Sequence, residues 1–304
     1  MSDLVTVILA AGKGTRMKSV LPKVLHQAAG KPMVQHVIDA ARLAGARRNI
    51  VVVGFGAELV RSALRGKVEI VVQAEQLGTG HAVRMAEPLL KAEHGTVMVL
   101  CGDTPLLTGA LLSRLYEAHK KAGAKATVLT AIMPDATGYG RVIRSATGAV
   151  EKIVEDKDAT DEERKVQEVN SGIYCFAADA LFSALAEVNC DNAQGEYYLP
   201  DVLSILREKG EKIWAVAAED YEETLGVNSR PTVGSREDLA AAQESGADGE
   251  RRYPDGSGHY FYRRRCCRRA RYRHLPLHLD RGRFVRWRGL RFRPVEPVQR
   301  YENR

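Results

Sequence analysis

The sequence lacks any long apolar run and has only five cysteines in 304 residues. A membrane-spanning helix needs roughly 20 consecutive apolar residues, and the longest early run, residues 5–11, is far shorter. The start, Met1-Ser2-Asp3, has no basic segment of the kind that opens a secretory signal. The cysteines show no framework spacing, which favours a reducing, cytoplasmic setting over a disulfide scaffold. We therefore do not expect a secreted, membrane or fibrous protein.

Lysine is absent from one part of the chain. Residues 251–304 contain 17 arginines, no lysine and four acidic residues, whereas the rest has 28 basic and 34 acidic side chains. The formal net charge of +7 therefore combines an acidic body with a strongly basic segment. We predict three parts: a domain over residues 1–230, a linker with a short helix over 231–245, and a basic segment over 246–304 with irregular structure.

The body alternates short apolar runs with helical patterns. Buried strands are predicted over residues 5–10, 50–53, 68–72, 97–101 and 126–132. Helices are predicted over residues 33–44, 57–64, 80–91 and 111–121. Single helices between such strands imply right-handed crossovers, so we predict an α/β fold with a doubly wound, mostly parallel, Rossmann-like sheet.

The pattern changes after Met133. Residues 138–143 and 150–154 predict the short strands of a small inserted β-subregion. A strand over 168–176, a helix over 197–209 and a last strand over 213–218 follow. In doubly wound sheets ligands bind beyond the carboxyl ends of strands, where the strand order reverses. The strand ends are therefore where a site is expected.

The first strand end carries a glycine-rich loop, Leu9-Ala10-Ala11-Gly12-Lys13-Gly14-Thr15-Arg16-Met17, which continues to Lys23. Small residues let backbone N–H groups approach a polyphosphate, and Arg16 and Lys23 supply positive charge. The loop is neither a Walker A motif nor a Rossmann fingerprint. A plain tight turn with solvated lysines is the simpler alternative.

Two further strand ends carry polar motifs. In Gln73–Ala82, an amide precedes Gly78-Thr79-Gly80, and an amide can pair with both donors and acceptors of a nucleobase. In Cys101–Pro105, Asp103 leaves a buried strand after a glycine, a common way to hold Mg²⁺ near phosphates. The structural alternatives are helix N-caps at Thr79 and at Asp103. Together the three motifs predict nucleotidyl transfer.

Five segments resemble the uridylyltransferase domain of the bacterial N-acetylglucosamine-1-phosphate uridylyltransferase family: Leu9–Lys23, Gln73–Ala82, Gly138–Arg141, Asn192–Tyr198 and Gly226–Asn228. The resemblance covers about residues 4–230, and Gln73–Ala82 and Asn192–Tyr198 are its most specific parts. In that family the domain is usually fused to a glucosamine-1-phosphate acetyltransferase domain. The resemblance implies a Mg²⁺-dependent enzyme that makes UDP-N-acetylglucosamine, a cell-wall precursor, from UTP and N-acetylglucosamine 1-phosphate.

The resemblance also implies roles for individual residues. The uridine is expected at the backbone of Leu9, Ala10, Ala11 and Gly12 and at the side chain of Gln73, with Gly78 and Thr79 beside it. Arg16 and Lys23 are expected to contact the phosphates, and Asp103 and Asn228 to hold Mg²⁺. The sugar is expected at Gly140, Glu155 and Asn170. Of these, Arg16, Lys23 and Asp103 are the implied catalytic residues. Cys101 stands where the family commonly has tyrosine, and we expect little consequence because Asp103 is kept.

The resemblance stops after about Ser245. No hexapeptide periodicity of an acetyltransferase β-helix follows, so we expect neither acetyltransferase activity nor a basis for the family's trimer. For residues 246–304, arginine without lysine suggests a reading-frame change in a GC-rich gene. Arginines with interleaved aromatics could instead bind nucleic acid. A zinc site has only weak support, because its candidate ligands lack the usual spacing; they are Cys266, Cys267, His274 and His278.

Two other functions stay open for the whole chain. One is transfer to a different sugar 1-phosphate. The other is a nucleic-acid-binding module with poor catalysis that acts through the basic segment. An intact glycine-rich loop, Lys23 and Asp103 favour an enzyme acting on small molecules.

Overall fold

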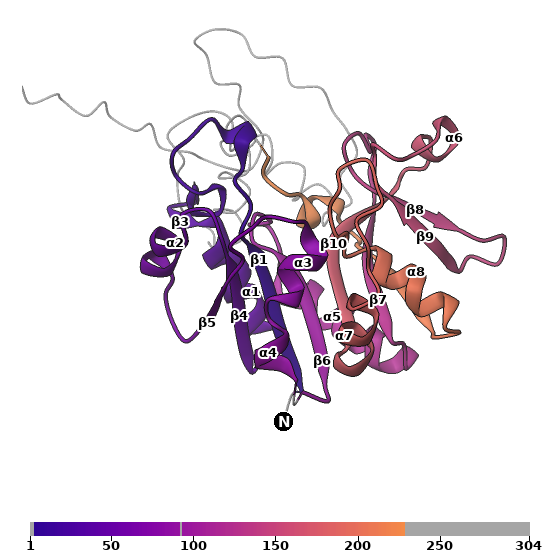
Figure 1. Ribbon diagram of the computed structural model, residues 1–304, viewed down its shortest axis with the longest axis horizontal. Helices are drawn as coiled ribbons and strands as arrows, with labels where there is room; N and C mark the ends of the chain where they lie inside the picture. The colour runs from indigo at the N-terminus through magenta and orange to yellow at the C-terminus, as the bar shows by residue number, and fades with distance from the viewer. Residues whose placement is uncertain (1–2, 92, 229–304) are drawn as a thin grey trace, which may run out of the picture. The chain divides into compact units, whose positions relative to one another are not determined.

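The computed structural model describes residues 3–91 and 93–228, which form a nine-stranded sheet and a separate two-stranded one (Figure 1). The main path of the large sheet runs β11-β7-β10-β6-β1-β4-β5. These strands are β1 (Leu4–Ala10), β4 (Arg48–Val53), β5 (Glu69–Val72), β6 (Thr96–Cys101), β7 (Ala126–Ile132), β10 (Glu168–Ala177) and β11 (Ile213–Ala217). Along this path β10 runs antiparallel to β6 and β7, and the other pairs are parallel. The predicted mostly parallel sheet is confirmed.

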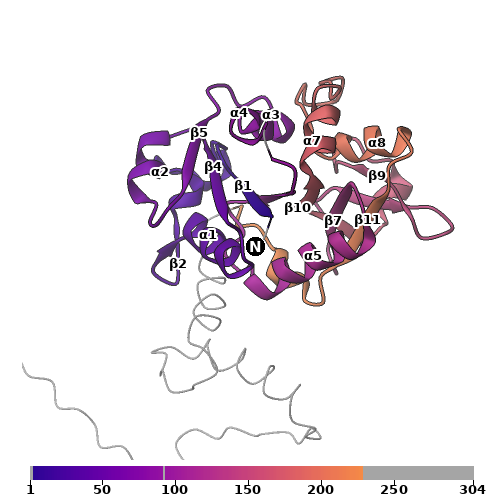
Figure 2. The same ribbon diagram turned by 90° about the horizontal axis from the view of Figure 1, so that it is seen from below.

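Helices cover both faces of the sheet (Figure 2). On one face lie α1 (Met33–Leu43), α2 (Ala57–Ala63) and α5 (Gly109–Ala122), and on the other lie α3 (Thr79–Arg84), α4 (Glu87–Leu90), α7 (Ala178–Leu185) and α8 (Asp201–Glu208). Neighbouring strand residues divide between the two cores: Ile8 packs with α1 and α5, and Val7 packs with α3 and α7. Because both faces are buried, the strands are apolar throughout. This is the predicted doubly wound arrangement.

Two predicted helix boundaries are wrong. The single helix expected over 80–91 is two helices, because Pro88 has no N–H to continue the turn and instead lies in the first turn of α4. The helix expected from Tyr197 begins at Asp201, after Pro200. Elements that the sequence analysis missed are α7, α6 (Asp161–Arg164) and the short hairpin of β2 (Gln27–Ala28) and β3 (Lys31–Pro32). No helix in the described ranges is long and apolar enough to cross a bilayer.

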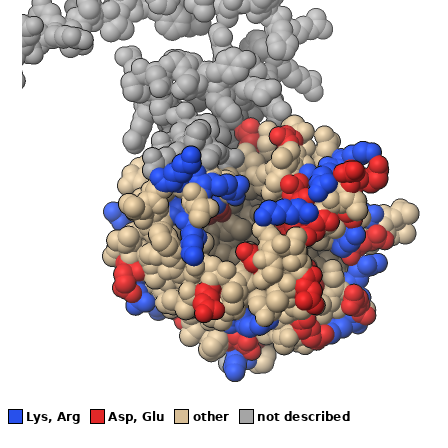
Figure 3. All heavy atoms as spheres, turned by 45° about the horizontal axis from the view of Figure 1, so that its top comes forward, with Lys and Arg blue, Asp and Glu red and all other residues tan. Residues whose placement is uncertain are grey.

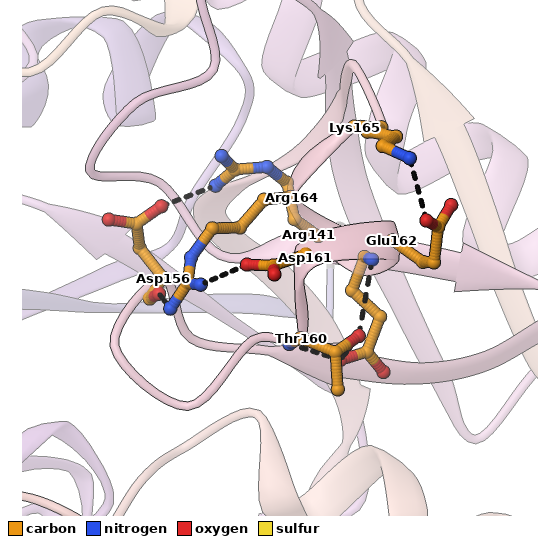
Figure 4. A network of polar contacts seen from close by, with 8 residues as sticks. Arg141, Asp156, Thr160, Asp161, Glu162, Arg164 and Lys165 are labelled. Atoms are coloured by element: carbon orange, nitrogen blue, oxygen red, sulfur yellow. Dashed lines mark hydrogen bonds and ion pairs between the residues drawn. The ribbon is translucent and has the colours of Figure 1, made fainter.

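The predicted inserted hairpin is present as β8 (Arg141–Arg144) and β9 (Val150–Val154), which pair antiparallel. Figure 4 shows how the loop that follows it is held. The guanidinium of Arg141, almost fully buried, pairs with Asp156 at 3.0 Å. Arg164 donates to the backbone carbonyl of Asp156, and Thr160 caps α6 through a capping box. Residues 155–160 are therefore fixed beside β8.

Candidate functional site

The strand order reverses at β1, which has β4 on one side and β6 on the other. The backbone N–H of Gly102, after β6, donates to the carbonyl of Leu9 at 2.9 Å. A Cβ at position 102 would lie 2.9 Å from the same oxygen, so only glycine allows this approach. Asp103 is thereby held against the glycine-rich loop, at the place where such sheets bind ligands. The face seen in Figure 3 is hollowed, with Lys and Arg gathered along one rim.

The glycine-rich loop folds back over its own base. Gly14 adopts a φ of 59°, and a Cβ there would lie 2.6 Å from the Cβ of Lys23. Met17 is buried and anchors the loop, while Arg16 stays exposed. A Cβ at Gly12 would meet nothing within 4 Å, so the backbone at this position borders open space. These features suit a loop that receives a ligand at its backbone and carries cations above it.

Four of the predicted residues form one polar cluster. Lys23 forms an ion pair with the carboxylate of Asp103 and donates to the side-chain oxygen of Asn228 at 2.9 Å. Arg16 donates to the same oxygen at 3.0 Å. The backbone N–H of Val227 donates to the carbonyl of Asp103 at 2.9 Å, which fixes the loop that carries Asn228. The cluster joins residues up to 212 positions apart in the sequence.

The donor chemistry of this cluster fits a magnesium ion. One carboxylate and one amide oxygen are hard ligands, and Mg²⁺ near phosphates commonly takes only one or two protein ligands. Gly226 leaves room beside them, because a Cβ there would lie 3.7 Å from both carboxylate oxygens of Asp103. Within the described residues no group of three or more His, Cys, Asp and Glu side chains could hold a metal. A metal here would therefore need phosphate or water ligands as well.

The turn between β5 and α3 holds the predicted base-reading residues. Gln73 is only 3% exposed, and its amide nitrogen donates to the carbonyl of Gly78 at 3.1 Å and contacts His81 at 3.0 Å. Gly78, not Thr79, is the N-cap of α3. The hydroxyl of Thr79 instead accepts a hydrogen bond from the backbone N–H of Leu199 at 3.0 Å. The alternative in which Thr79 caps the helix is therefore wrong.

The corresponding alternative for Asp103 is wrong as well. The next helix, α5, is capped by Thr108, whose hydroxyl accepts from the backbone N–H of Leu111. The Asp103 carboxylate remains in the polar cluster with Lys23. Its neighbour Cys101 contacts the carbonyl of Gly172 at 3.5 Å. Burial raises the pKa of the Cys101 thiol to about 12, so the thiol stays neutral.

The three residues expected at the sugar lie together. The backbone N–H of Asn170 donates to the carbonyl of Gly140 at 2.8 Å. A Cβ at Gly140 would lie 3.3 Å from a carboxylate oxygen of Glu155, so glycine keeps the carboxylate accessible. Asn170 is 9% exposed and its side-chain oxygen accepts from the backbone N–H of Gly172. Its amide group is thus oriented by the bulge in β10.

A cavity of about 270 Å³ is lined by Glu155 and by several other acidic side chains. Its lining includes Asp158, Asn192, Tyr198 and Asp201. Burial, then the negative charges of Asp158 and Asp201, raise the pKa of Glu155. Burial and Asp158 raise the pKa of Asp201 in the same way. Of these acids only Glu155 is implied by the resemblance, because Asp158 and Asp201 carry no motif of their own.

Several sequence predictions fall on residues 229–304 and lie outside the described residues. They are the linker helix, the nucleic-acid interpretation of the basic segment, and the zinc interpretation of Cys266, Cys267, His274 and His278. Among the described residues, Cys101, Cys175 and Cys190 are free thiols.

Comparison with known proteins gives consistent matches. The family model described as "Nucleotidyl transferase" matches residues 5–245. "Bifunctional protein GlmU" of Shouchella clausii is 58% identical over 237 residues, and that of Bacillus subtilis is 53% identical over 237 residues; each match covers 78% of this chain and 52% of the relative. The chain spans about half the length of these curated relatives.

One solved structure supports the fold. A UDP-glucose pyrophosphorylase complexed with UDP-glucose superposes with a TM-score of 0.65 at 17% identity, over 80% of this chain and 100% of that one. At this identity the likeness concerns the fold alone. It agrees with the doubly wound sheet described above.

Proposed function

Because the chain belongs to the nucleotidyl transferase family, we propose that it transfers the uridylyl group of UTP to N-acetylglucosamine 1-phosphate. The products are UDP-N-acetylglucosamine, a cell-wall precursor, and pyrophosphate. One observation carries this proposal: Arg16, Lys23, Asp103 and Asn228, from three distant segments, meet at the strand end where a nucleotide is expected. The 58% identity to a GlmU protein over 237 aligned residues supports the choice of substrates.

The reaction needs alignment more than proton transfer. A phosphate oxygen of the sugar phosphate attacks the α-phosphorus of UTP, a new P–O bond forms, and the bond to the β-phosphate oxygen breaks. The attacking oxygen is already anionic, so no general base is required. Lys23 and Arg16 turn from Asp103 and Asn228 to the triphosphate, where they take up the charge of the leaving pyrophosphate. Holding both reactants in line supplies much of the rate enhancement.

Asp103 and Asn228 are the residues that would hold Mg²⁺. The ion, when bound, supplies neutralisation of the negative charge on the phosphates that approach each other. Gly102 fixes where the Asp103 carboxylate lies, through its contact with Leu9.

The other subsites follow from position. Leu9, Ala10, Ala11 and Gly12 offer backbone groups to uridine at the end of β1. Gln73 adds a side chain whose amide oxygen accepts no hydrogen bond from any residue in the described part of the chain. Glu155 and Asn170 offer the sugar one carboxylate and one amide, and Gly140, which has no Cβ, leaves room beside the carboxylate. A hydroxyl-rich, uncharged sugar ring suits this set of acceptors and donors.

We keep the proposed division of the chain: a catalytic domain over residues 1–230, a linker over 231–245 and a basic segment over 246–304. The free thiols Cys101, Cys175 and Cys190 support the expected cytoplasmic location. Nothing in the described residues supports acetyl transfer, so we do not propose it for this chain.

The test is pyrophosphate release from UTP and N-acetylglucosamine 1-phosphate, with Mg²⁺ and with EDTA. We expect Mg²⁺-dependent release that requires both substrates. A panel of four nucleoside triphosphates and several sugar phosphates separates this function from that of another sugar nucleotidyltransferase. If release is absent while oligonucleotides bind with a steep salt dependence that is lost on truncation at about residue 245, the nucleic-acid interpretation is the correct one.

A further inference from the structure

A separate cavity of about 380 Å³ is lined by residues of the β2–β3 hairpin, of α1, and of the end of α2 with the segment after it. It is larger than the cavity lined by Glu155, and small-molecule pockets typically span about 300–1,000 Å³. None of its lining residues belongs to the catalytic site described above. We call it the Arg42 cavity, and its polar lining consists of Lys31, Gln35, Asp39, Arg42 and Arg65.

One wall of the Arg42 cavity contains a buried amide. Gln35 is only 4% exposed; its amide nitrogen donates to Asp39 at 2.9 Å, and its oxygen accepts from the backbone N–H of Arg65 at 2.9 Å. Lys31 donates to the other carboxylate oxygen of Asp39 at 3.1 Å. Both oxygens of Asp39 are thus occupied, and the segment that carries Arg65 is fixed to α1.

The guanidinium of Arg42 is held mainly by uncharged groups. It donates to the carbonyls of Arg65 at 3.4 Å and of Lys67 at 3.2 Å, whereas it lies 3.9 Å from Asp39. Gly66 has a φ of 83°, and a Cβ there would overlap this guanidinium, so the position requires glycine. The carbonyls orient the guanidinium without neutralising its charge.

The Arg42 cavity is positively charged although the body around it is acidic. Lys31, Arg42 and Arg65 line it together with one acid, Asp39, which gives a net charge of +2. Residues 1–250 as a whole contain more acidic than basic side chains. Among residues 3–91 and 93–228, no side chain pairs with the guanidinium of Arg65. The cavity therefore has positive charge that its own acid does not balance.

We propose that the Arg42 cavity binds a small metabolite that carries a phosphate monoester. A dianion matches the net charge of the lining. Its three terminal oxygens can accept hydrogen bonds from cations on three different segments, and guanidinium groups match phosphate in geometry. This binding site is separate from the catalytic site and does not depend on the proposed function.

The test is a titration of the full chain with methyl phosphate at pH 8, above the second pKa of a phosphate monoester, which is about 6. The amide resonances of Gly30 and Gly66, both in the lining, should shift saturably. Arg65→Gln should weaken binding roughly tenfold, because one charged hydrogen bond is lost. Asp39→Asn should tighten binding roughly threefold, because a like charge is removed. Arg61→Gln, exposed on α2 and outside the cavity, is the control and should behave as wild type.

Two other probes test the chemical class of the ligand. Dimethyl phosphate has one negative charge, and malonate has two charges but planar carboxylates. Each should bind at least roughly fivefold more weakly than methyl phosphate, because it lacks either the second charge or the tetrahedral set of oxygens. Equal binding of the three probes, no saturable shift, or an unchanged affinity in Arg65→Gln would overturn the proposal.

A last arm separates the Arg42 cavity from the catalytic site. UTP with Mg²⁺, at the concentration that just saturates the shifts of Gly12 and Gly14, should leave the affinity of methyl phosphate measured at Gly30 and Gly66 within about twofold. Loss of the response at Gly30 and Gly66 would mean that the cavity is not a separate site. If UTP shifts no resonance while methyl phosphate binds as expected, the proposed function is wrong and the phosphate site stands.

Discussion

The polar cluster around Asp103 (the phosphate side) and the cavity lined by Glu155 (the sugar side) arrange their charges in opposite ways. On the phosphate side, Lys23 and Arg16 meet Asp103 and Asn228, so every charge faces an opposite charge or an amide oxygen. On the sugar side, Glu155 faces Asp158 and Asp201, and burial with like charges raises its pKa. In the proposed function, the first arrangement would exchange its partners for phosphate and metal, and the second would offer acceptors to a neutral, hydroxyl-rich ligand.

The largest expected effect comes from removing the acid on the phosphate side. Asp103→Ala should lower turnover at least about 100-fold, because one preorganised charge contact in a transition state is typically worth about 2.7–4 kcal/mol. The fold should be kept, since the backbone carbonyl of residue 103 still accepts from Val227. Steady-state pyrophosphate release and circular dichroism check both points, with Asp179→Ala, an exposed pair partner of Lys125, as control. Near-normal turnover would remove Asp103 from the site.

Removing the central cation should have the next largest effect. Lys23→Met keeps the side-chain length but leaves the triphosphate with one fewer positive partner, so kcat/KM for UTP should fall roughly 30-fold. In the free enzyme, Lys23→Met should increase the affinity for Mn²⁺, because Asp103 and Asn228 lose a competing cation. Electron paramagnetic resonance measures this Mn²⁺ binding. Lys121→Met on α5 is the control. Unchanged Mn²⁺ binding would contradict the exchange of partners on the phosphate side.

A smaller effect is expected from the sugar side. Glu155→Gln replaces an acceptor oxygen by a donor and should raise the KM for N-acetylglucosamine 1-phosphate roughly tenfold, with little change for UTP. The pH dependence sharpens the test. In the wild type, this KM should rise as pH falls through the raised pKa of Glu155, because the protonated acid is a poorer acceptor. The glutamine variant should lose that dependence, and a KM that still varies with pH would assign the titration to another group.

The smallest effect concerns stability. The raised pKa of Glu155 means that its protonated form is favoured by folding, so its ionisation destabilises the protein as pH rises through that pKa. Glu155→Gln should therefore stabilise the fold at pH 8, by no more than about 1 kcal/mol. The gain should shrink towards pH 4.5. Thermal unfolding at both pH values measures this gain, and an equal gain at both would show that the ionisation of buried Glu155 is not its cause.

Much of the fold could be predicted from the sequence because its signals are local. Apolar strands such as residues 5–10 and 97–101 are buried on both faces, and their composition shows it. The reversed direction of β10 depends on pairing with two strands distant in sequence, which no local pattern encodes. The late start of α8 has a similar cause, since Tyr197 is engaged by Leu77 and Gly80 rather than by its own helix.

The site divides in the same way. The glycine-rich loop, Gln73 and Asp103 could be found because they stand at strand ends in recognisable motifs. Asn228 and Glu155 followed only from the resemblance, since an isolated loop residue has no chemical signature. The acids Asp158 and Asp201 were missed because their role depends on facing Glu155 across a cavity. Spatial convergence of this kind is visible only in three dimensions.

Asn228, which accepts hydrogen bonds from both Arg16 and Lys23, has a consequence for the synthesis of the chain. A ribosome adds Arg16, Lys23 and Asp103 early, yet Asn228 more than a hundred residues after the last of them. Until that residue emerges, the nascent chain has its phosphate cradle without the side chain that closes it. A growing chain should therefore not consume nucleotide, and competence should arrive in one step near the end of the domain's translation.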